Sequence, residues 1–96
     1  MADVIITSNG KWVKGDFNGS NRDKIDFEYR PLSSIRTVSL HDTSTTKGTY
    51  VCVKFADGGI WTFDYSTSRG YKVQSVDATS ITDNASLLTA LAALIP

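Results

Sequence analysis

The sequence contains few of the residues that build covalently linked or metal-linked folds. It has one cysteine, Cys52, and one histidine, His41. A lone cysteine cannot form an internal disulfide, and structural zinc needs four ligands. Asp16, Asn18 and Ser20 have the spacing that opens a calcium loop, but the glycine and the glutamate that complete such a loop are missing. We therefore expect no metal and no other cofactor, and a fold that depends on packing.

Long apolar runs and an excess of one charge are also absent. No run approaches the roughly 20 residues of a membrane span, and the opening MADVIITSNG lacks the basic and apolar parts of a signal peptide. Ten basic and ten acidic residues give a formal net charge of zero. Proteins that bind nucleic acid or anionic membranes cluster Lys and Arg. We expect neither partner, and we expect a cytoplasmic location or a particle assembled in the cytoplasm.

The length predicts one domain over residues 1–96, because two-domain chains are usually longer. Strands are expected over about 4–77 and a C-terminal helix over about 83–95. A chain of this size buries only about 60 to 65% of its unfolded surface, so a supporting partner would add useful stability.

Two hairpins are visible in the sequence. The first joins Val4–Ser8 to Lys11–Phe17 through Asn9-Gly10, which predicts a type I′ turn. In the second hairpin, the favoured register is the one that buries the apolar side chains of both strands together. It places Val51, Val53 and Phe55 on the same face as Tyr65, Phe63 and Trp61. That register needs a three-residue loop, Asp57-Gly58-Gly59, with Gly59 in the left-handed conformation.

Three further strands are predicted between and after these hairpins. Lys24–Arg30 alternates strictly, with Ile25, Phe27 and Tyr29 on one face, and Pro31 ends it. From Ser34 to Asp42 the apolar positions change phase, which indicates a bulge. Tyr71–Asp77 is the last strand.

The segment Thr82–Ile95 has the spacing of an amphipathic helix capped by Thr82 or Asp83. Leu87, Leu91 and Leu94 form its apolar stripe, which Leu88 and Ile95 widen. Its other face carries Ala85, Ala90, Ala92 and Ala93 in place of the Lys and Glu of a solvated helix. Such a face permits close approach by another protein surface.

The predicted fold class is therefore mainly β, with about seven antiparallel strands in a small barrel or sandwich and one C-terminal helix. SSIRTVSL followed by VKFADGGIWTF resembles the central meander of a pleckstrin-homology-like domain, which has the same element order. Fold-level similarity of this kind implies no function.

No set of residues predicts catalysis. His41-Asp42 lies near Ser39, but no strand-to-helix elbow presents the serine and no glycine-rich oxyanion loop adjoins it. Cys52 is predicted on the face opposite the core, where it lacks a base to orient it. We expect no enzyme and no small-molecule substrate.

The short β-rich body, the loop HDTSTTKG and the terminal ITDNASLLTALAALIP resemble small bacteriophage virion accessory proteins. The resemblance implies a structural subunit of a capsid, head–tail junction or tail, located in the virion, whose partners are other virion proteins or copies of itself. The residues predicted to face such neighbours are Leu88, Ala92 and Ile95, with Trp12 and Tyr50 as aromatic anchors.

The alternative from another class is a cytoplasmic adaptor with a pleckstrin-like fold that recognises a peptide or an anionic lipid headgroup. Headgroup recognition needs convergent basic residues. The candidates are Lys11, Lys14, Arg22 and Lys24.

Overall fold

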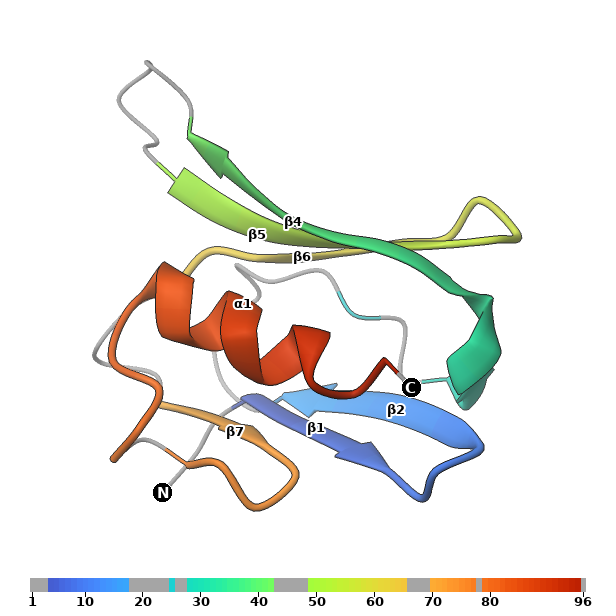
Figure 1. Cartoon of the computed structure of the whole chain (residues 1–96), viewed down its shortest axis with the longest axis horizontal. Coiled ribbons are helices and arrows are strands. Elements are labelled where there is room, and N and C mark those ends of the chain that lie inside the picture. The colour runs from blue at the N-terminus through green and yellow to red at the C-terminus, as the bar shows by residue number, and fades with distance from the viewer. Residues whose placement is uncertain are drawn as a thin grey trace.

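The computed structural model describes residues 4–17, 25, 28–42, 49–65, 70–77 and 79–95. Seven strands form two sheets, and the helix α1 lies between them (Figure 1). The predicted mainly β class with one C-terminal helix is confirmed. The sheets do not close into a barrel, so the architecture is a sandwich, with the helix packed against β4, β5 and β7.

Sheet A has the strand order β3-β2-β1-β7. It comprises β1 (Val4–Ser8), β2 (Trp12–Phe17), β3 (Arg30–Pro31) and β7 (Tyr71–Val73). The expected antiparallel pairing holds for β1 with β2 and for β2 with β3, but β7 runs parallel to β1. The chain therefore leaves sheet A after β3 and returns to it through β7.

The first hairpin turns one residue later than predicted. Asn9 pairs with Trp12, because the Asn9 N–H donates to the Trp12 carbonyl at 3.1 Å. The central residues are thus Gly10 and Lys11, and Gly10 alone has a positive φ, at +90°. That pattern belongs to a type II′ turn. The Asn9 side chain stabilises it by accepting from the Lys11 and Trp12 N–H groups at 3.0 and 2.8 Å.

The predicted strand Lys24–Arg30 is not found in the part of it that the structure describes, residues 25 and 28–30. Only Arg30 belongs to a strand there, and Pro31 lies inside β3 opposite Trp12. Ile25 is buried, whereas Tyr29 is 68% exposed, so the two do not share a core face. Phe27 and Lys24 lie outside the described residues.

Gly15 explains how Ile25 is buried without a strand around it. A Cβ at Gly15 would lie 2.5 Å from the Ile25 Cγ2 and 3.1 Å from the Ile6 Cδ1. The missing side chain of Gly15 therefore leaves the space into which Ile25 packs against β1 and β2.

Sheet B has the order β4-β5-β6, and all its pairs are antiparallel. The strands are β4 (Ile35–Asp42), which follows a short 3-10 turn (Leu32–Ser34), β5 (Thr49–Phe55) and β6 (Ile60–Phe63). The predicted phase change in β4 is confirmed as a register shift between Ile35 and Thr37.

The predicted faces of the second hairpin are confirmed, but its loop lies one residue earlier. Val51 pairs with Phe63 and Val53 with Trp61, while the Phe55 N–H donates to the Gly59 carbonyl at 2.8 Å. The loop is therefore 56–58, and Gly58, not Gly59, has the positive φ, at +92°.

Gly59 is needed for a different reason, which is room for Arg30. A Cβ at Gly59 would lie 2.6 Å from a guanidinium nitrogen of Arg30. Arg30 donates two bonds to the Asp57 carboxylate, at 3.0 and 2.9 Å, and its guanidinium carbon lies 4.4 Å from the Phe55 ring centroid. Arg30 comes from β3, so this contact joins sheet A to the β5–β6 hairpin of sheet B.

Strand β7 ends at Val73, four residues before the predicted end at Asp77. Gln74 has a φ of 57°, and Val73 forms an isolated bridge with Val76. The Gln74 amide side chain then bonds both backbone groups of Ser8, accepting from its N–H at 2.9 Å and donating to its carbonyl at 2.5 Å. The Gln74 side chain therefore continues the hydrogen bonding to β1 beyond Val73, where the backbone pairing of β7 ends.

Helix α1 (Asn84–Ala92) is capped by Asp83, one of the two predicted caps. The Asp83 carboxylate accepts from the Ser86 N–H at 2.8 Å, and the Ser86 hydroxyl oxygen accepts from the Asp83 N–H at 3.1 Å. This reciprocal arrangement is a capping box. The α-helix ends three residues before the predicted Ile95, and a turn follows.

Two aspartates predict how stability depends on pH. Backbone hydrogen bonds from Gly59 and Ser86 are the main cause that lowers the pKa of Asp57 and of Asp83, respectively. Because each folded-state pKa lies below the unfolded value of about 3.9, this stabilisation is present above that value and is lost as the pH falls through the folded-state pKa. Urea midpoints measured from pH 7 to pH 2.5 should fall below about pH 4. The fall should be smaller in Asp57→Asn with Asp83→Asn, and an equal fall in that variant would contradict the assignment.

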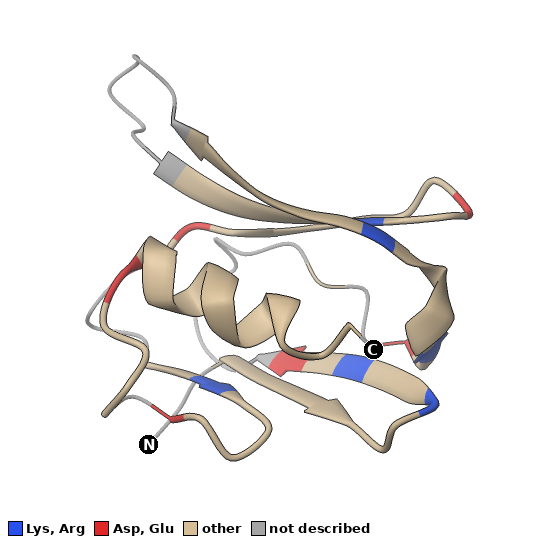
Figure 2. Cartoon of the chain, in the orientation of Figure 1, with Lys and Arg blue, Asp and Glu red and all other residues tan. Residues whose placement is uncertain are grey.

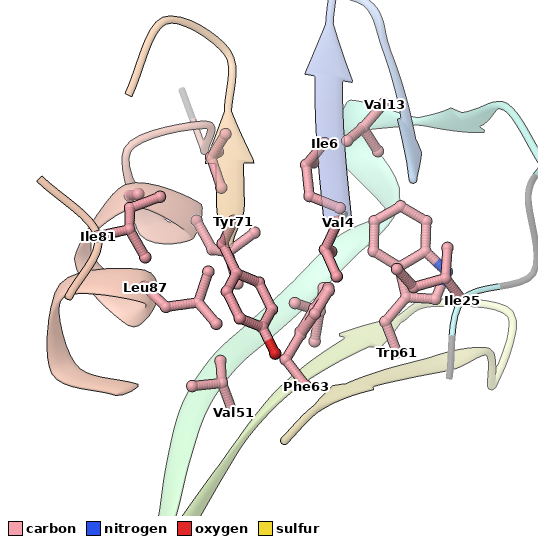
Figure 3. Close-up of a cluster of buried hydrophobic side chains, with 14 of the residues drawn as sticks. Val4, Ile6, Val13, Ile25, Val51, Trp61, Phe63, Tyr71, Ile81 and Leu87 are labelled. Atoms are coloured by element: carbon pink, nitrogen blue, oxygen red, sulfur yellow. The ribbon is translucent and has the colours of Figure 1, made fainter. Parts of the chain in front are cut away.

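The core is one continuous cluster that takes side chains from both sheets and the helix (Figure 3). Trp61 is 1% exposed and meets Phe55 and Phe63 edge-on, at centroid distances of 4.9 and 6.4 Å. Tyr71 is fully buried and donates its hydroxyl hydrogen to the Asp64 carbonyl at 3.1 Å. These aromatic side chains fill the space between the layers.

Candidate interface

The surface of α1 is uncharged along its whole length. No Lys, Arg, Asp or Glu occurs from Asn84 to Ile95, and Figure 2 shows the helix without a charged residue. The residues that point to solvent are mostly small or apolar: Ala85, Thr89, Ala92, Ala93 and Ile95. Ile95 is 39% exposed, which is high for a large aliphatic side chain.

The buried face of α1 matches the predicted leucine stripe, with two corrections: Ile95, predicted to widen the stripe, is exposed, and Ala90 is buried. Leu87 and Leu91 are buried, and Leu88 and Leu94 are half-buried against the core. Ala90, predicted on the outward face with the other alanines, is only 8% exposed. It lies three residues after Leu87 and four before Leu94, spacings that place it on the same side of the segment as these leucines.

Trp12 lies on the outer face of sheet A, away from α1. Val13 and Gly15 are buried, so Trp12 and Lys14 point the other way along β2. Trp12 is 44% exposed and faces Pro31 across the sheet. Close by, the Lys14 Nζ lies 5.2 Å from the Tyr29 ring centroid and 3.4 Å from an Asp16 carboxylate oxygen.

Tyr50 lies on the outer face of sheet B, in register with His41. Their rings stack at a centroid distance of 4.8 Å and an interplanar angle of 9°. The His41 Nε2 also lies 2.9 Å from the Ser39 Oγ. A serine–histidine contact on an open sheet face is not by itself an active site, because acyl transfer also needs a group that orients the base and donors for the oxyanion.

Cys52 shares the outer face with Ser39 but is only 4% exposed. Burial raises the pKa of its thiol, while the nearby Lys54 acts in the opposite direction. The thiol therefore stays protonated near neutral pH and lacks the thiolate character of a reactive cysteine.

The thiol offers a direct test of this burial. Folded protein should react with a thiol-specific reagent at least about tenfold more slowly than urea-unfolded protein, because local opening must precede attack. Equal rates would contradict the burial of Cys52.

The five residues predicted to face neighbours do not form one surface. Leu88 and Ala92 belong to α1, Ile95 lies just after the turn that follows α1, Trp12 lies on the outer face of sheet A, and Tyr50 lies on the outer face of sheet B. Sequence reasoning missed four other exposed large apolar side chains among the described residues: Tyr29 at 68%, Ile60 at 51%, Leu40 at 42% and Val76 at 36%.

Among the described residues, His, Cys, Asp and Glu side chains do not gather in any group of three that could hold a metal ion. None of the helical segments in the same part of the chain has the length and apolar character needed to cross a membrane.

A hollow at the β5–β6 end of sheet B is lined by residues that include Arg36, Lys54 and Ile60.

Comparison with protein families, curated proteins and solved structures finds no match to this chain.

Proposed function

We propose that this chain is a non-enzymatic structural subunit of a protein assembly and that α1 contacts a neighbouring subunit. The observation that supports this is the exposed, uncharged surface made by Ala85, Thr89, Ala92, Ala93 and Ile95. A helix face that meets only water normally carries Lys and Glu. Small side chains also let another backbone approach closely, and depletion of charge is typical of the centre of an interface.

The assembly that we propose is a bacteriophage particle. This part rests on the resemblance of the β-rich body, the loop HDTSTTKG and the terminal segment to small virion proteins. In such a particle the subunit acts by shape and contact, its partners are other virion proteins or further copies of itself, and no small-molecule substrate takes part.

The test places a charge in the proposed contact. Ala92→Glu changes a small exposed side chain and should alter the free energy of unfolding by no more than about 0.5 kcal/mol. Ile95→Glu loses the covered part of a larger side chain and should cost about 1 kcal/mol, so the protein stays folded in both variants. Burying an unpaired carboxylate in a contact should instead lower incorporation into the particle by about tenfold or more. Quantitative mass spectrometry of purified particles measures the incorporation of each variant.

The matched control is Thr7→Glu, which adds the same charge at an exposed position on sheet A. Its incorporation should equal that of the unchanged chain. Equal incorporation of all three variants would contradict the α1 contact, and absence of the unchanged chain from every particle would contradict the phage assignment.

The adaptor alternative is tested on vesicles. Lys14 already contacts Asp16 and the Tyr29 ring, Lys11 is exposed, and Arg22 and Lys24 lie outside the described residues. Salt-sensitive binding to phosphatidylserine vesicles that disappears in Lys11→Ala with Lys14→Ala would favour the adaptor over the structural subunit.

A further inference from the structure

The hollow beside the loop 56–58 opens on the outer face of sheet B and has a volume of about 390 Å³. Thr37, Lys54 and Ile60 line it in one row across the three strands, because Lys54 pairs with Thr37 on β4 and with Ile60 on β6. Phe55 is buried on the inner face, so its neighbour Lys54 and the residues paired with Lys54 lie on the outer face. Arg36 also lines the hollow. The lining therefore combines two basic residues with a threonine and an exposed aliphatic residue.

A β-bulge explains why Arg36 and Thr37 line the same hollow. Neighbouring residues of a regular strand point to opposite faces of the sheet. The register shifts between Ile35, which stands opposite Phe55, and Thr37, which stands opposite Lys54. Arg36 is therefore an extra residue with no partner on β5, and a bulge of this kind re-aims a side chain. The bulge adds a second cation to the hollow.

The positive charge of the hollow is not balanced from within the described residues. Neither Arg36 nor Lys54 forms a salt bridge or a hydrogen bond there. Asp57 is the only acidic residue between Cys52 and Phe63, and its carboxylate accepts two bonds from Arg30, at 3.0 and 2.9 Å. Arg30 therefore neutralises Asp57. Two like charges at one hollow repel each other, and an anion bound between them would relieve that repulsion.

We propose that the hollow binds an acidic side chain of a partner protein, together with an aliphatic side chain next to it in that partner. A guanidinium group binds a carboxylate through two parallel N–H···O bonds, and an ammonium group adds a charge-assisted bond of its own. Arg36 and Lys54 supply these donors. Ile60 is 51% exposed beside Lys54, and the partner's aliphatic side chain would remove its apolar surface from water.

The exposure of the lining favours a protein over a free small molecule. Arg36, Thr37, Lys54 and Ile60 are all exposed, so the hollow is shallow. Sites for small molecules bury about 70–90% of the ligand surface, which an open hollow does not do. A protein partner brings further surface around the acidic side chain and excludes water from the charge pair. A nucleic acid is disfavoured, because its binding proteins contact phosphates with about 6–10 basic groups and the hollow offers two.

The experiment titrates isotopically labelled protein with a capped heptapeptide of alternating glutamate and leucine and follows the backbone amide signals by NMR. The largest shifts should occur at Arg36, Thr37, Lys54 and Ile60, with a dissociation constant of about 1 mM or below. Arg36→Ala and Lys54→Ala should each raise this constant at least about fivefold, because each removes a charge-assisted hydrogen bond. Both change exposed side chains, so the variants should keep the amide spectrum of the folded protein. Lys72→Ala, the matched control on β7, should leave the constant unchanged.

A second peptide tests the role of Ile60. A capped heptapeptide of alternating glutamate and serine has the same charge but no aliphatic side chain, and the unchanged protein should bind it at least about threefold more weakly. Ile60→Ser should weaken binding of the leucine peptide by a similar factor and leave binding of the serine peptide unchanged. The difference between the two effects isolates the apolar contact.

Four results would overturn the inference. They are the absence of amide shifts up to about 10 mM leucine peptide, equal binding of a peptide of alternating lysine and leucine, and losses in Arg36→Ala and Lys54→Ala no larger than in Lys72→Ala. The fourth is binding of inorganic phosphate as tight as that of the leucine peptide, which would make the hollow a site for small anions.

The inference goes beyond the proposed function, since it uses a different face from α1 and specifies the chemistry of a partner. The two fail separately. Ala92→Glu and Ile95→Glu should block incorporation into a particle while leaving peptide binding at the hollow unchanged.

Discussion

Trp61→Ala should lower the free energy of unfolding by about 3–5 kcal/mol, the largest loss expected from any single substitution considered for this chain. Figure 3 shows Trp61 of sheet B pointing towards Ile25 and Val4, which come from the other side of the core. At 1% exposure it can lose its packing only by leaving a cavity between the layers. Small domains have a total stability of about 5–15 kcal/mol, so the variant should be close to unfolding at 37 °C. Urea unfolding followed by circular dichroism measures the loss.

The second tryptophan provides the matched control. Trp12 is 44% exposed on the outer face of sheet A. Trp12→Ala removes the same side chain but should lower the free energy of unfolding by only about 1–2 kcal/mol, because much of the Trp12 side chain already meets solvent. Losses of similar size in the two variants would contradict the assignment of Trp61 to the core and Trp12 to the surface.

Leu87→Ala should lower the free energy of unfolding by about 2–5 kcal/mol. Leu87 is fully buried, and it points from α1 into the cluster that contains Tyr71 and Val51 (Figure 3). Its removal therefore weakens the contact of the helix with both sheets. The same urea measurement detects the loss.

Thr89→Ala is the control within the same helix. Thr89 is exposed, and alanine has the higher helix propensity, so stability should stay the same or rise slightly. If Leu87→Ala were as mild as Thr89→Ala, α1 would not be packed between the sheets.

The sequence correctly predicted which side chains share a buried face, because the spacing of apolar residues along a strand or helix indicates that face. A one-residue slip in the second hairpin would expose Val51 and Val53, so their shared face with Trp61 and Phe63 followed directly from the apolar pattern. The leucine stripe of α1 and the phase change in β4 follow from periodicity in the same way.

Details of the turns depended on interactions that composition does not show. The Asn9 side chain bonds two N–H groups of the following turn and moves it by one residue. Gly59 looked suited to a left-handed conformation, but its role is to leave space for Arg30, which comes from a distant strand. Neither contact is visible from local sequence.

The sequence also could not predict which strands pair when they are far apart along the chain. The parallel contact of β1 with β7 joins residues more than sixty positions apart, and nothing in either strand specifies it. The alternation around Ile25 and Tyr29 is typical of a strand, but Ile25 is buried beside Gly15 while Tyr29 is exposed. For the candidate interface, the sequence alone shows that α1 has no charged residue. The exposure of Leu40 could not be predicted, because the sequence does not show that β4 is an edge strand.

The most direct test of the central claim is oxidative footprinting of Ile95 in the isolated chain and in the purified particle that contains it. Hydroxyl radicals label exposed side chains, and Ile95 is 39% exposed in the isolated chain. If α1 and the residues that follow it form a subunit contact, labelling of Ile95 should fall at least about fivefold in the particle, since the centre of an interface excludes water. Equal labelling of Ile95 in the two samples would contradict the claim.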